Sequence, residues 1–313
     1  MPERQEITAL VENIEKAIIG KRQVILQVAA ALLAGGHVLV EDVPGVGKTQ
    51  MASALSRSVS GTFNRLQMTP DVMPADIVGY MMIHPESKKI VYQKGAVYCN
   101  FFLADEINRA SPKAQSGLLE VMEERQISIE GRTIPLPRPF MVLATQNPVE
   151  TYGTYHLPEA QMDRFLMRIV VGYPSKEKEM QILSDIEGDN ALQNVAAVFS
   201  LAEVERMQRD AAAVTANQLI REYIWEIVNA TRHDENIRLG VSPRGALALQ
   251  RAAKATAFIN GRDYVIPDDV RTVAAPVLAH RLILSPRGKS SCASQEQALS
   301  QLLERVGVPI AAV

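Results

Sequence analysis

The chain has 313 residues, of which 47% are hydrophobic and 22% charged, which suits one large or two modest globular domains. Its 33 lysine and arginine residues nearly balance its 35 acidic residues. The net charge of -2 gives no overall attraction to nucleic acid or to an anionic membrane. The two cysteines, Cys99 and Cys292, have no metal-ligand spacing. They disfavour a disulfide framework and favour a reducing compartment.

The N-terminal sequence is charged and lacks the apolar core of a signal peptide. The most apolar stretch, residues 24–40, is interrupted by a glutamine, two glycines and a histidine. It is too short and too interrupted for a membrane span, and a buried helix followed by a strand is the better interpretation. We therefore expect a cytoplasmic protein.

Short apolar runs alternate with helical patterns in the first part of the chain. Four of these runs are predicted to be buried strands: residues 37–43, 100–106, 139–146 and 168–174. Each is apolar at its centre and stops at polar or turn residues, as parallel strands covered on both faces do. This alternation predicts an α/β domain with a doubly wound parallel sheet over residues 1–174.

One helix between these strands carries clear boundary signals. Over residues 111–125, Ser111 can cap the first turn and Pro112 suits the first helical position. Leu118, Leu119 and Met122 mark the face that we expect to be buried.

Strand-like runs disappear after residue 174, and the remaining patterns are helical. We predict a small all-helical domain over residues 175–288, in which one helix begins at Ser242-Pro243 and ends at Gly261. Residues 289–313 form a C-terminal tail that is polar at first and contains a short helix over 297–305.

A glycine-rich turn follows the first predicted strand and precedes a helix. Its residues are Pro44, Gly45, Val46, Gly47, Lys48 and Thr49. Backbone N–H groups of such a loop surround phosphate oxygens, Lys48 can reach the β- and γ-phosphates, and the Thr49 hydroxyl is placed for Mg²⁺. Asp42 stands where the general motif has its first glycine, so this acid must point away from the phosphates or toward a cation. A chance glycine turn is the minor alternative.

Polar side chains end two further strands. Asp105 is expected beside Mg²⁺, and Glu106 can act as general base on the attacking water. The alternative, an ordinary strand ending in solvated acids, becomes minor beside a phosphate loop. Asn147 can orient the lytic water, or it is simply a turn residue before Pro148.

These segments together resemble the MoxR family of AAA+ ATPases over roughly residues 10–285. The most specific runs are LADEINRA with MEERQ, and GTY-x-LPEAQ-x-DRF. Further matching segments are GGHVLVEDVPGVGKT (35–49), TPDVMPADIVGY (69–80) and SPRGA (242–246). The resemblance implies an AAA+ P-loop domain followed by a helical lid, ATP/ADP and Mg²⁺ as cofactors, and ATP hydrolysis.

The resemblance also assigns roles to individual positions. Arg164 corresponds to an arginine finger that reaches a neighbouring subunit, and Arg244 to a second sensor that contacts phosphate from the lid. Lys48 and Thr49 correspond to the Walker A residues, with Gly47 and Gln50 beside them, and Asp105 and Glu106 correspond to the Walker B pair. Asn147 corresponds to the first sensor, and Ile19 and Gly20 lie in the segment that resembles the family's segment beside the adenine. A salt-bridged surface arginine is the alternative for Arg164, and a local pair or cap is the alternative for Arg244.

Family membership also implies partners. A homo-oligomer, expected as a hexameric ring, would act as a chaperone on a client protein with a von Willebrand A domain partner. The region 79–97 resembles an inserted hairpin that often faces substrate. Its methionines Met81 and Met82, and Met73 before it, either make adaptable contacts with substrate or pack within the protein. Arg109 is a further interface candidate, whereas His37 and Cys99 are expected to be structural.

Two other classes of function stay open. A nucleic-acid motor is disfavoured by the balanced charge and by the lack of a basic and aromatic stretch. A scaffold that binds ATP without hydrolysing it is disfavoured by the presence of Glu106, Asn147 and Arg164.

Overall fold

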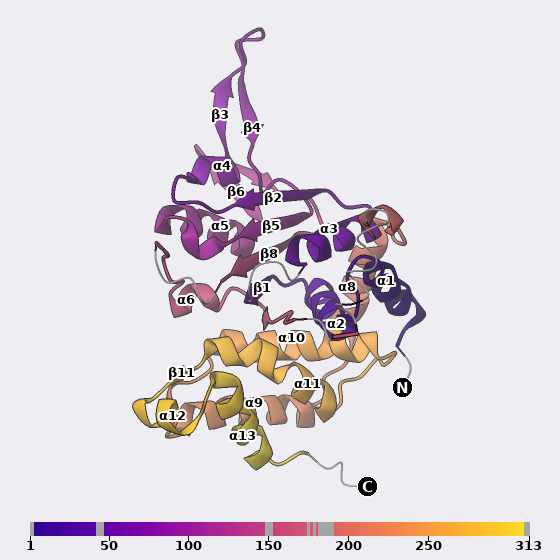
Figure 1. Ribbon diagram of the computed structural model, residues 1–313, viewed down its shortest axis with the longest axis vertical. Helices are drawn as coiled ribbons and strands as arrows, with labels where there is room; N and C mark the ends of the chain where they lie inside the picture. The colour runs from indigo at the N-terminus through magenta and orange to yellow at the C-terminus, as the bar shows by residue number, and fades with distance from the viewer. Residues whose placement is uncertain are drawn as a thin grey trace.

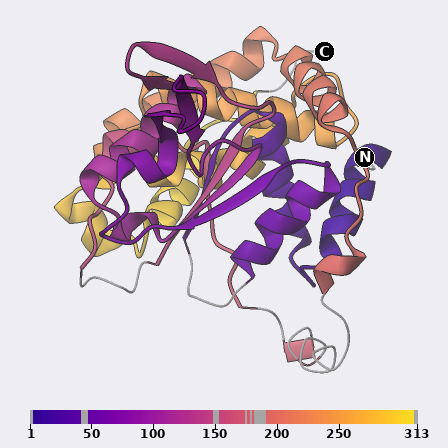
Figure 2. The same cartoon turned by 90° about the horizontal axis from the view of Figure 1, so that it is seen from above.

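The computed structural model describes residues 3–41, 47–147, 153–173, 176, 177, 180 and 191–309. A five-stranded parallel sheet with helices on both faces forms the upper part of the molecule (Figures 1 and 2). The strands lie in the order β2-β5-β8-β1-β9. They are β1 (Val38–Glu41), β2 (Phe63–Gln67), β5 (Phe101–Asp105), β8 (Met141–Gln146) and β9 (Met167–Ile169). The predicted α/β domain with a parallel sheet is confirmed.

Successive side chains of β5 enter two different hydrophobic cores, because neighbouring side chains in a strand point to opposite faces. Phe101 and Leu103 join the core beneath the N-terminal helices, whereas Phe102 and Ala104 join the core beneath α5. The helices of the first face are α1 (Gln5–Glu15), α2 (Arg22–Leu33) and α3 (Lys48–Ser58), and α5 (Pro112–Glu124) covers the second. Burial on both faces explains why β5 is apolar almost throughout.

Three of the four predicted strands contain an observed strand, whereas the fourth, predicted over residues 168–174, overlaps β9 only at residues 168 and 169. Strand β2 was not predicted. This strand lies at the edge of the sheet, and none of its five residues is fully buried. Its sequence, FNRLQ, therefore lacks the apolar run of a central strand.

Helix α5 begins as its sequence predicts. Ser111 is the N-cap, its Oγ accepts a hydrogen bond from the Ala114 N–H, and Pro112 occupies the first turn. The predicted apolar face, represented by Leu118 and Met122, is buried.

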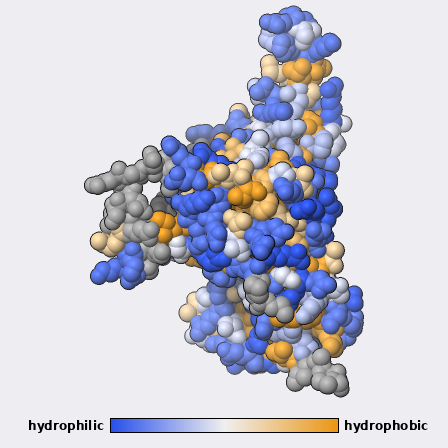
Figure 3. Space-filling model, turned by 90° about the vertical axis from the view of Figure 1, so that its right-hand side faces the viewer, coloured by the Kyte–Doolittle hydropathy of each residue, from blue (hydrophilic) through white to orange (hydrophobic). Residues whose placement is uncertain are grey.

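A long antiparallel hairpin projects from the α/β domain at the position of the predicted insertion (Figure 1). It consists of β3 (Gly79–Ile83) and β4 (Ile90–Lys94), and it follows α4 (Pro74–Val78). At its base Gly79 has φ 88°, and a Cβ there would lie 2.2 Å from the Gln93 carbonyl oxygen. Apolar patches interrupt the polar surface along the projection (Figure 3), and Ile83 and Ile90 are exposed. A second hairpin is formed by β6 (Gln126–Ile129) and β7 (Arg132–Pro135).

The second domain is a helical lid beneath the sheet (Figure 1). Its helices are α8 (Leu201–Ala213), α9 (Gln218–His233), α10 (Pro243–Ile259), α11 (Pro267–Leu278), α12 (Pro286–Ser291) and α13 (Gln295–Arg305). It is not entirely helical as predicted, because β10 (Ile237–Leu239) and β11 (Ile283–Leu284) form a short antiparallel pair. Such short, partly exposed strands have no distinctive hydrophobic pattern. The helix expected over 297–305 is α13, which begins two residues earlier.

The tail expected after residue 288 packs against the lid through α13, whose Leu299 and Leu302 are buried. We therefore propose that the lid continues to about residue 305. A short helix, α6 (Glu159–Met162), precedes β9. Among the residues that the structure describes, no helix has the length and apolar character needed to cross a membrane.

One hydrophobic core extends from the α/β domain into the lid. Val11 and Val28 of the N-terminal helices belong to the same buried cluster as Leu249 and Val273 of the lid. The two parts of the chain therefore share an apolar interior in addition to the polar contacts described below.

Candidate active site

A cavity of about 420 Å³ opens where the central strands end and α3 begins. It brings residues of the predicted phosphate loop together with the predicted acids and Asn147. The described residues that line it are Gly47, Lys48, Thr49, Gln50, Arg65, Gln67, Asp105, Glu106, Thr145 and Asn147. Three further predicted loop residues, Pro44, Gly45 and Val46, lie outside the described residues. The carboxyl edge of a parallel sheet is where such folds bind ligands.

Gly47 connects the loop to the first turn of α3. Its φ of 90° is a left-handed conformation that glycine adopts without a Cβ penalty. A Cβ at this position would also lie 3.4 Å from Ile18 Cδ1. The segment expected beside adenine therefore approaches the loop through Ile18, whereas Ile19 and Gly20 are not among the described residues that line the cavity.

Asp105, the last residue of β5, has both carboxylate oxygens hydrogen-bonded. Thr145 Oγ1 donates to Asp105 Oδ1 at 2.6 Å, and Arg65 Nη2 contacts Asp105 Oδ2 at 2.6 Å. The same threonine hydroxyl oxygen accepts a hydrogen bond from the Glu106 N–H at 2.8 Å. Thr145, which is buried at the end of β8, therefore fixes both acids relative to the neighbouring strand.

Glu106 has φ 57°, the left-handed region that is uncommon for residues other than glycine. Such backbone conformations cluster at functional sites, where the surrounding structure enforces them. Gln67 Nε2 donates to Glu106 Oε2 at 2.7 Å, and Arg109 Nη1 contacts the same oxygen at 3.0 Å. Arg109, expected as a possible interface cation, thus pairs with the predicted general base of its own chain.

The composition of the cavity fits a nucleotide with Mg²⁺. Its volume lies within the range of small-molecule sites, and an N-terminal helix turn with an adjacent lysine suits phosphate. Magnesium in phosphate sites is commonly held by one or two carboxylates and substrate oxygens. Asp105 and Thr49 line the same cavity and supply such oxygens. When bound, Mg²⁺ would neutralise phosphate charge.

Arg164 and Arg244 lie together, and neither is among the described residues that line this cavity. Glu123 of α5 pairs with both: its Oε2 lies 3.0 Å from Arg164 Nε, and its Oε1 accepts a hydrogen bond from Arg244 Nη2. The contact of Arg244 with phosphate stays a prediction, and in this structure its guanidinium pairs with Glu123. Its position depends on how the lid packs against α5.

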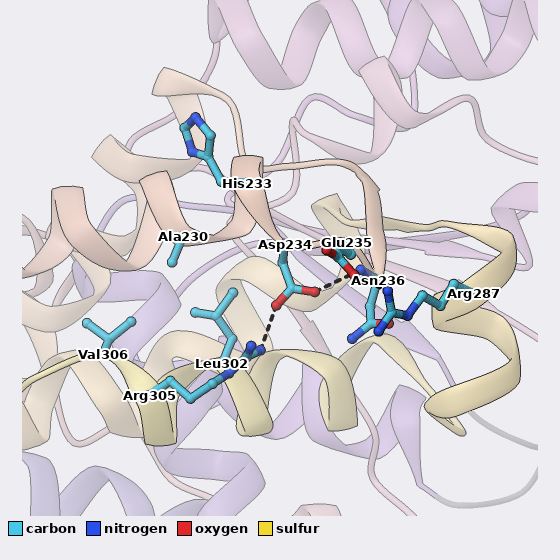
Figure 4. Close-up of a pocket in the computed structure, with 9 residues that line it drawn as sticks. All are labelled: Ala230, His233, Asp234, Glu235, Asn236, Arg287, Leu302, Arg305 and Val306. Atoms are coloured by element: carbon cyan, nitrogen blue, oxygen red, sulfur yellow. Dashed lines mark hydrogen bonds and ion pairs between the residues drawn. The ribbon is translucent and has the colours of Figure 1, made fainter.

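A second cavity, of about 440 Å³, lies within the lid between the end of α9 and the C-terminal helices (Figure 4). Its acids are paired within the chain, Asp234 with Arg305 at 2.6 Å and Glu235 with Arg287. It contains none of the motif residues, so the first cavity is the candidate active site.

His37 and Cys99 are buried away from that cavity, as expected for structural residues. His37 Nδ1 accepts a hydrogen bond from the Val142 N–H, and its Nε2 faces the Met122 carbonyl, both at 2.9 Å. These partners specify the neutral tautomer with its proton on Nε2. Burial of the Cys99 thiol raises its pKa to about 12, so the neutral thiol prevails.

Sequence reasoning missed Arg65, Gln67 and Thr145. Arg65 and Gln67 alternate along the unpredicted strand β2 and so point to the same side as the acids. Thr145 could have been noticed, because it is polar at the end of an apolar strand beside Asn147.

Comparison with known proteins agrees with this geometry. The model of the ATPase family associated with various cellular activities (AAA) matches residues 37–167, and the AAA lid domain matches residues 229–302. The protein YeaC of Bacillus subtilis is 46% identical over 300 residues, covering 96% of this chain and 94% of its own. Chaperone MoxR1 of Mycobacterium tuberculosis is 42% identical over 308 residues, covering 95% of this chain and 81% of its own. The crystal structure of a candidate ATPase from Cytophaga hutchinsonii is 38% identical, with a TM-score of 0.91 and coverage of 98% and 96%.

The fold and the site thus define an AAA-type P-loop protein with a helical lid. More narrowly, the chain belongs to the MoxR family of AAA+ ATPases.

Proposed function

We propose that this chain binds ATP with Mg²⁺ and hydrolyses it to ADP and phosphate. The observation that carries the proposal is the meeting of Lys48 and Thr49 with Asp105, Glu106 and Asn147 in one cavity at the carboxyl edge of the sheet. A simple nucleotide-binding scaffold has no need of a second acid beside the first.

Each residue has a distinct role in this proposal. Lys48 neutralises phosphate charge, and Thr49 and Asp105 hold Mg²⁺. Glu106 takes the proton of the attacking water, and the buried Asn147 amide orients that water. Gln67 and Arg109 both contact Oε2 of the Glu106 carboxylate, and Oε1 is the oxygen that we propose takes the proton.

The two arginines favour an active site shared between subunits. Arg164 and Arg244 lie side by side through Glu123, outside the described lining of their own cavity. We propose that both act on nucleotide held by the next subunit of a homo-oligomeric ring of six. An arginine finger supplied in this way stabilises the charge that develops in the transition state.

We further propose a chaperone role in assembling or activating protein complexes, with a client protein and a von Willebrand A domain partner. The name of the relative Chaperone MoxR1 supports the chaperone role. The exposed hairpin β3–β4 offers apolar side chains to a client. Two separate free cysteines support a reducing, cytoplasmic setting.

The direct test compares Glu106→Gln with Glu120→Gln, a matched change at an exposed acid of α5. Removal of a general base typically lowers the rate about 10²–10⁴-fold. We expect Glu106→Gln to bind ATP normally and to lose turnover by at least about a hundredfold, with Glu120→Gln unaffected. A loss smaller than tenfold removes Glu106 from the role of base. Turnover that requires DNA would instead favour the nucleic-acid motor.

A further inference from the structure

One carboxylate holds the two arginines that come from different domains. Glu123 extends from α5, Arg164 follows the short helix α6, and Arg244 lies in the first turn of the lid helix α10. The Glu123 side chain is 36% exposed, and those of Arg164 and Arg244 are 28% and 45% exposed. Ion pairs with this exposure contribute little to stability. The stability of the fold is therefore a weak reason for placing both arginines on Glu123.

Two guanidinium groups that converge on a carboxylate are also arranged to bind a phosphate, because both anions offer oxygens that match the planar guanidinium fork. Partial burial opposes ionisation of Glu123, but the hydrogen bond and charge of Arg244, followed by those of Arg164, lower its pKa. The carboxylate therefore stays charged and competes with any other anion for the same donors.

The backbones that carry the two arginines are joined through Asp163. Arg281 Nε contacts Asp163 Oδ1 at 2.6 Å, and Ser242 Oγ donates to Asp163 Oδ2 at 3.0 Å. The Arg281 side chain is 3% exposed, and its Nη2 also donates to the Phe165 carbonyl at 2.7 Å. Since Ser242 caps the helix of Arg244, this partly buried network fixes the spacing of the two arginine backbones. Their guanidinium groups, in contrast, meet at the exposed Glu123.

The surroundings contain excess positive charge. Burial, and then the charges of Arg125 and Arg244, lower the pKa of Arg251 on α10. Among the ion pairs of the described residues, Glu123 is the acid that contacts Arg164 and Arg244. Once Glu123 withdraws, these guanidinium groups would attract an anion.

We propose that Glu123 is a positioning residue that holds Arg164 and Arg244 as one anion-binding pair and occupies the place of the γ-phosphate of a neighbouring subunit. A neighbour's nucleotide must displace this carboxylate before the arginines can act. The inference rests on the proposed function, since it assumes that Arg164 and Arg244 act between subunits.

The first experiment measures anion binding and needs no ATPase activity. In a Lys48→Ala background, which weakens the phosphate loop, Glu123→Gln is compared with Glu124→Gln, the adjacent exposed acid. Inorganic phosphate should raise the Tm of the Glu123→Gln protein and not that of the Glu124→Gln protein. Adding Arg244→Ala to Glu123→Gln should abolish the rise. Equal responses of the two glutamine variants would overturn the proposal.

The second experiment measures assembly-dependent turnover with Lys48 intact. In the Glu123→Gln protein no carboxylate competes with the neighbour's nucleotide for the two arginines. This variant should therefore reach half of its maximal ATPase rate at a protein concentration about two- to fivefold lower than wild type, a shift that corresponds to the loss of an exposed ion pair. An unchanged or higher concentration, with a lower Tm, would show that Glu123 is only structural. If the wild type hydrolyses no ATP, the proposed function fails, while the phosphate experiment still decides whether the arginine pair binds anions.

Discussion

Acidification should destabilise the protein through His37, which joins three elements of the α/β domain. The imidazole bridges the Val142 N–H of β8 and the Met122 carbonyl of α5, and it precedes β1 directly. Burial, assisted by the charges of Arg125 and Arg251 and opposed by the hydrogen bond to Met122, lowers the pKa of His37 from 6.5 to about 4. The folded state therefore releases a proton that the unfolded chain binds below pH 6.5.

The sign and size follow from proton linkage. A depressed histidine pKa contributes nothing to destabilisation well above pH 6.5, and its cost grows as pH falls toward 4. The full shift of 2.5 pH units corresponds to about 3.4 kcal/mol at 1.36 kcal/mol per unit, of which about 2 kcal/mol is lost between pH 7 and pH 5. Burial and the charge of Arg281 also lower the pKa of His280, so acidification destabilises the folded state through this residue as well.

Urea unfolding at pH 7, 6 and 5, followed by circular dichroism, measures this loss directly. NMR titration of the ring C–H signals supplies a second measurement: the His37 ring should stay neutral at pH 5. His84→Gln should leave the pH dependence of stability unchanged. A free energy of unfolding that changes by less than about 0.5 kcal/mol between pH 7 and pH 5 would refute the reasoning.

Three predictions concern the candidate active site. Lys48→Ala should abolish binding of a fluorescent ATP analogue, because the loop over residues 44–49 then has no side-chain cation for the phosphate charge; micromolar affinity would contradict this. Thr145→Val leaves the Glu106 N–H without its acceptor, so the free energy of unfolding measured by thermal denaturation should fall by about 1–3 kcal/mol and turnover by at least about tenfold. Thr133→Val, a change at an exposed threonine, is the control, and equal behaviour of the two variants would exclude the bridging role of Thr145. Arg164→Ala and Glu106→Gln proteins should each be nearly inactive. Co-expression in equal amounts should restore activity, because random mixing places an intact Arg164 beside an intact Glu106 site at roughly a quarter of the interfaces. Inactive mixed rings of verified composition would show that Arg164 does not act between subunits.

The central strands could be predicted because their signals are local. Burial on both faces makes β5 and β8 apolar, and the polar residues that end them mark the edge of the sheet. The capping of α5 by Ser111 is equally local. In each case the residues that form the feature are neighbours in the sequence.

Features that depend on tertiary placement could not be predicted in the same way. Arg65 and Gln67 reach the acids only because β2 pairs in register with β5. Arg244 meets Glu123 only because the lid packs against α5, across a separation of 121 residues. Glu123 belongs to a segment that resembles the family, but its sequence context does not reveal its two partners.

The hydrophobic interior that continues from the N-terminal helices into the lid affects how the subunit can move. Parts that share a close-packed core cannot slide past one another without opening gaps that cost dispersion energy. A polar hinge, by contrast, would exchange its contacts with water. In the ring proposed above, such a shared core favours movement of each chain as one block, so that a change in shape during turnover would fall at the boundaries between blocks. The β3–β4 hairpin, fixed to its block by the close glycine contact at Gly79, converts a small rotation at such a boundary into a larger displacement at its tip.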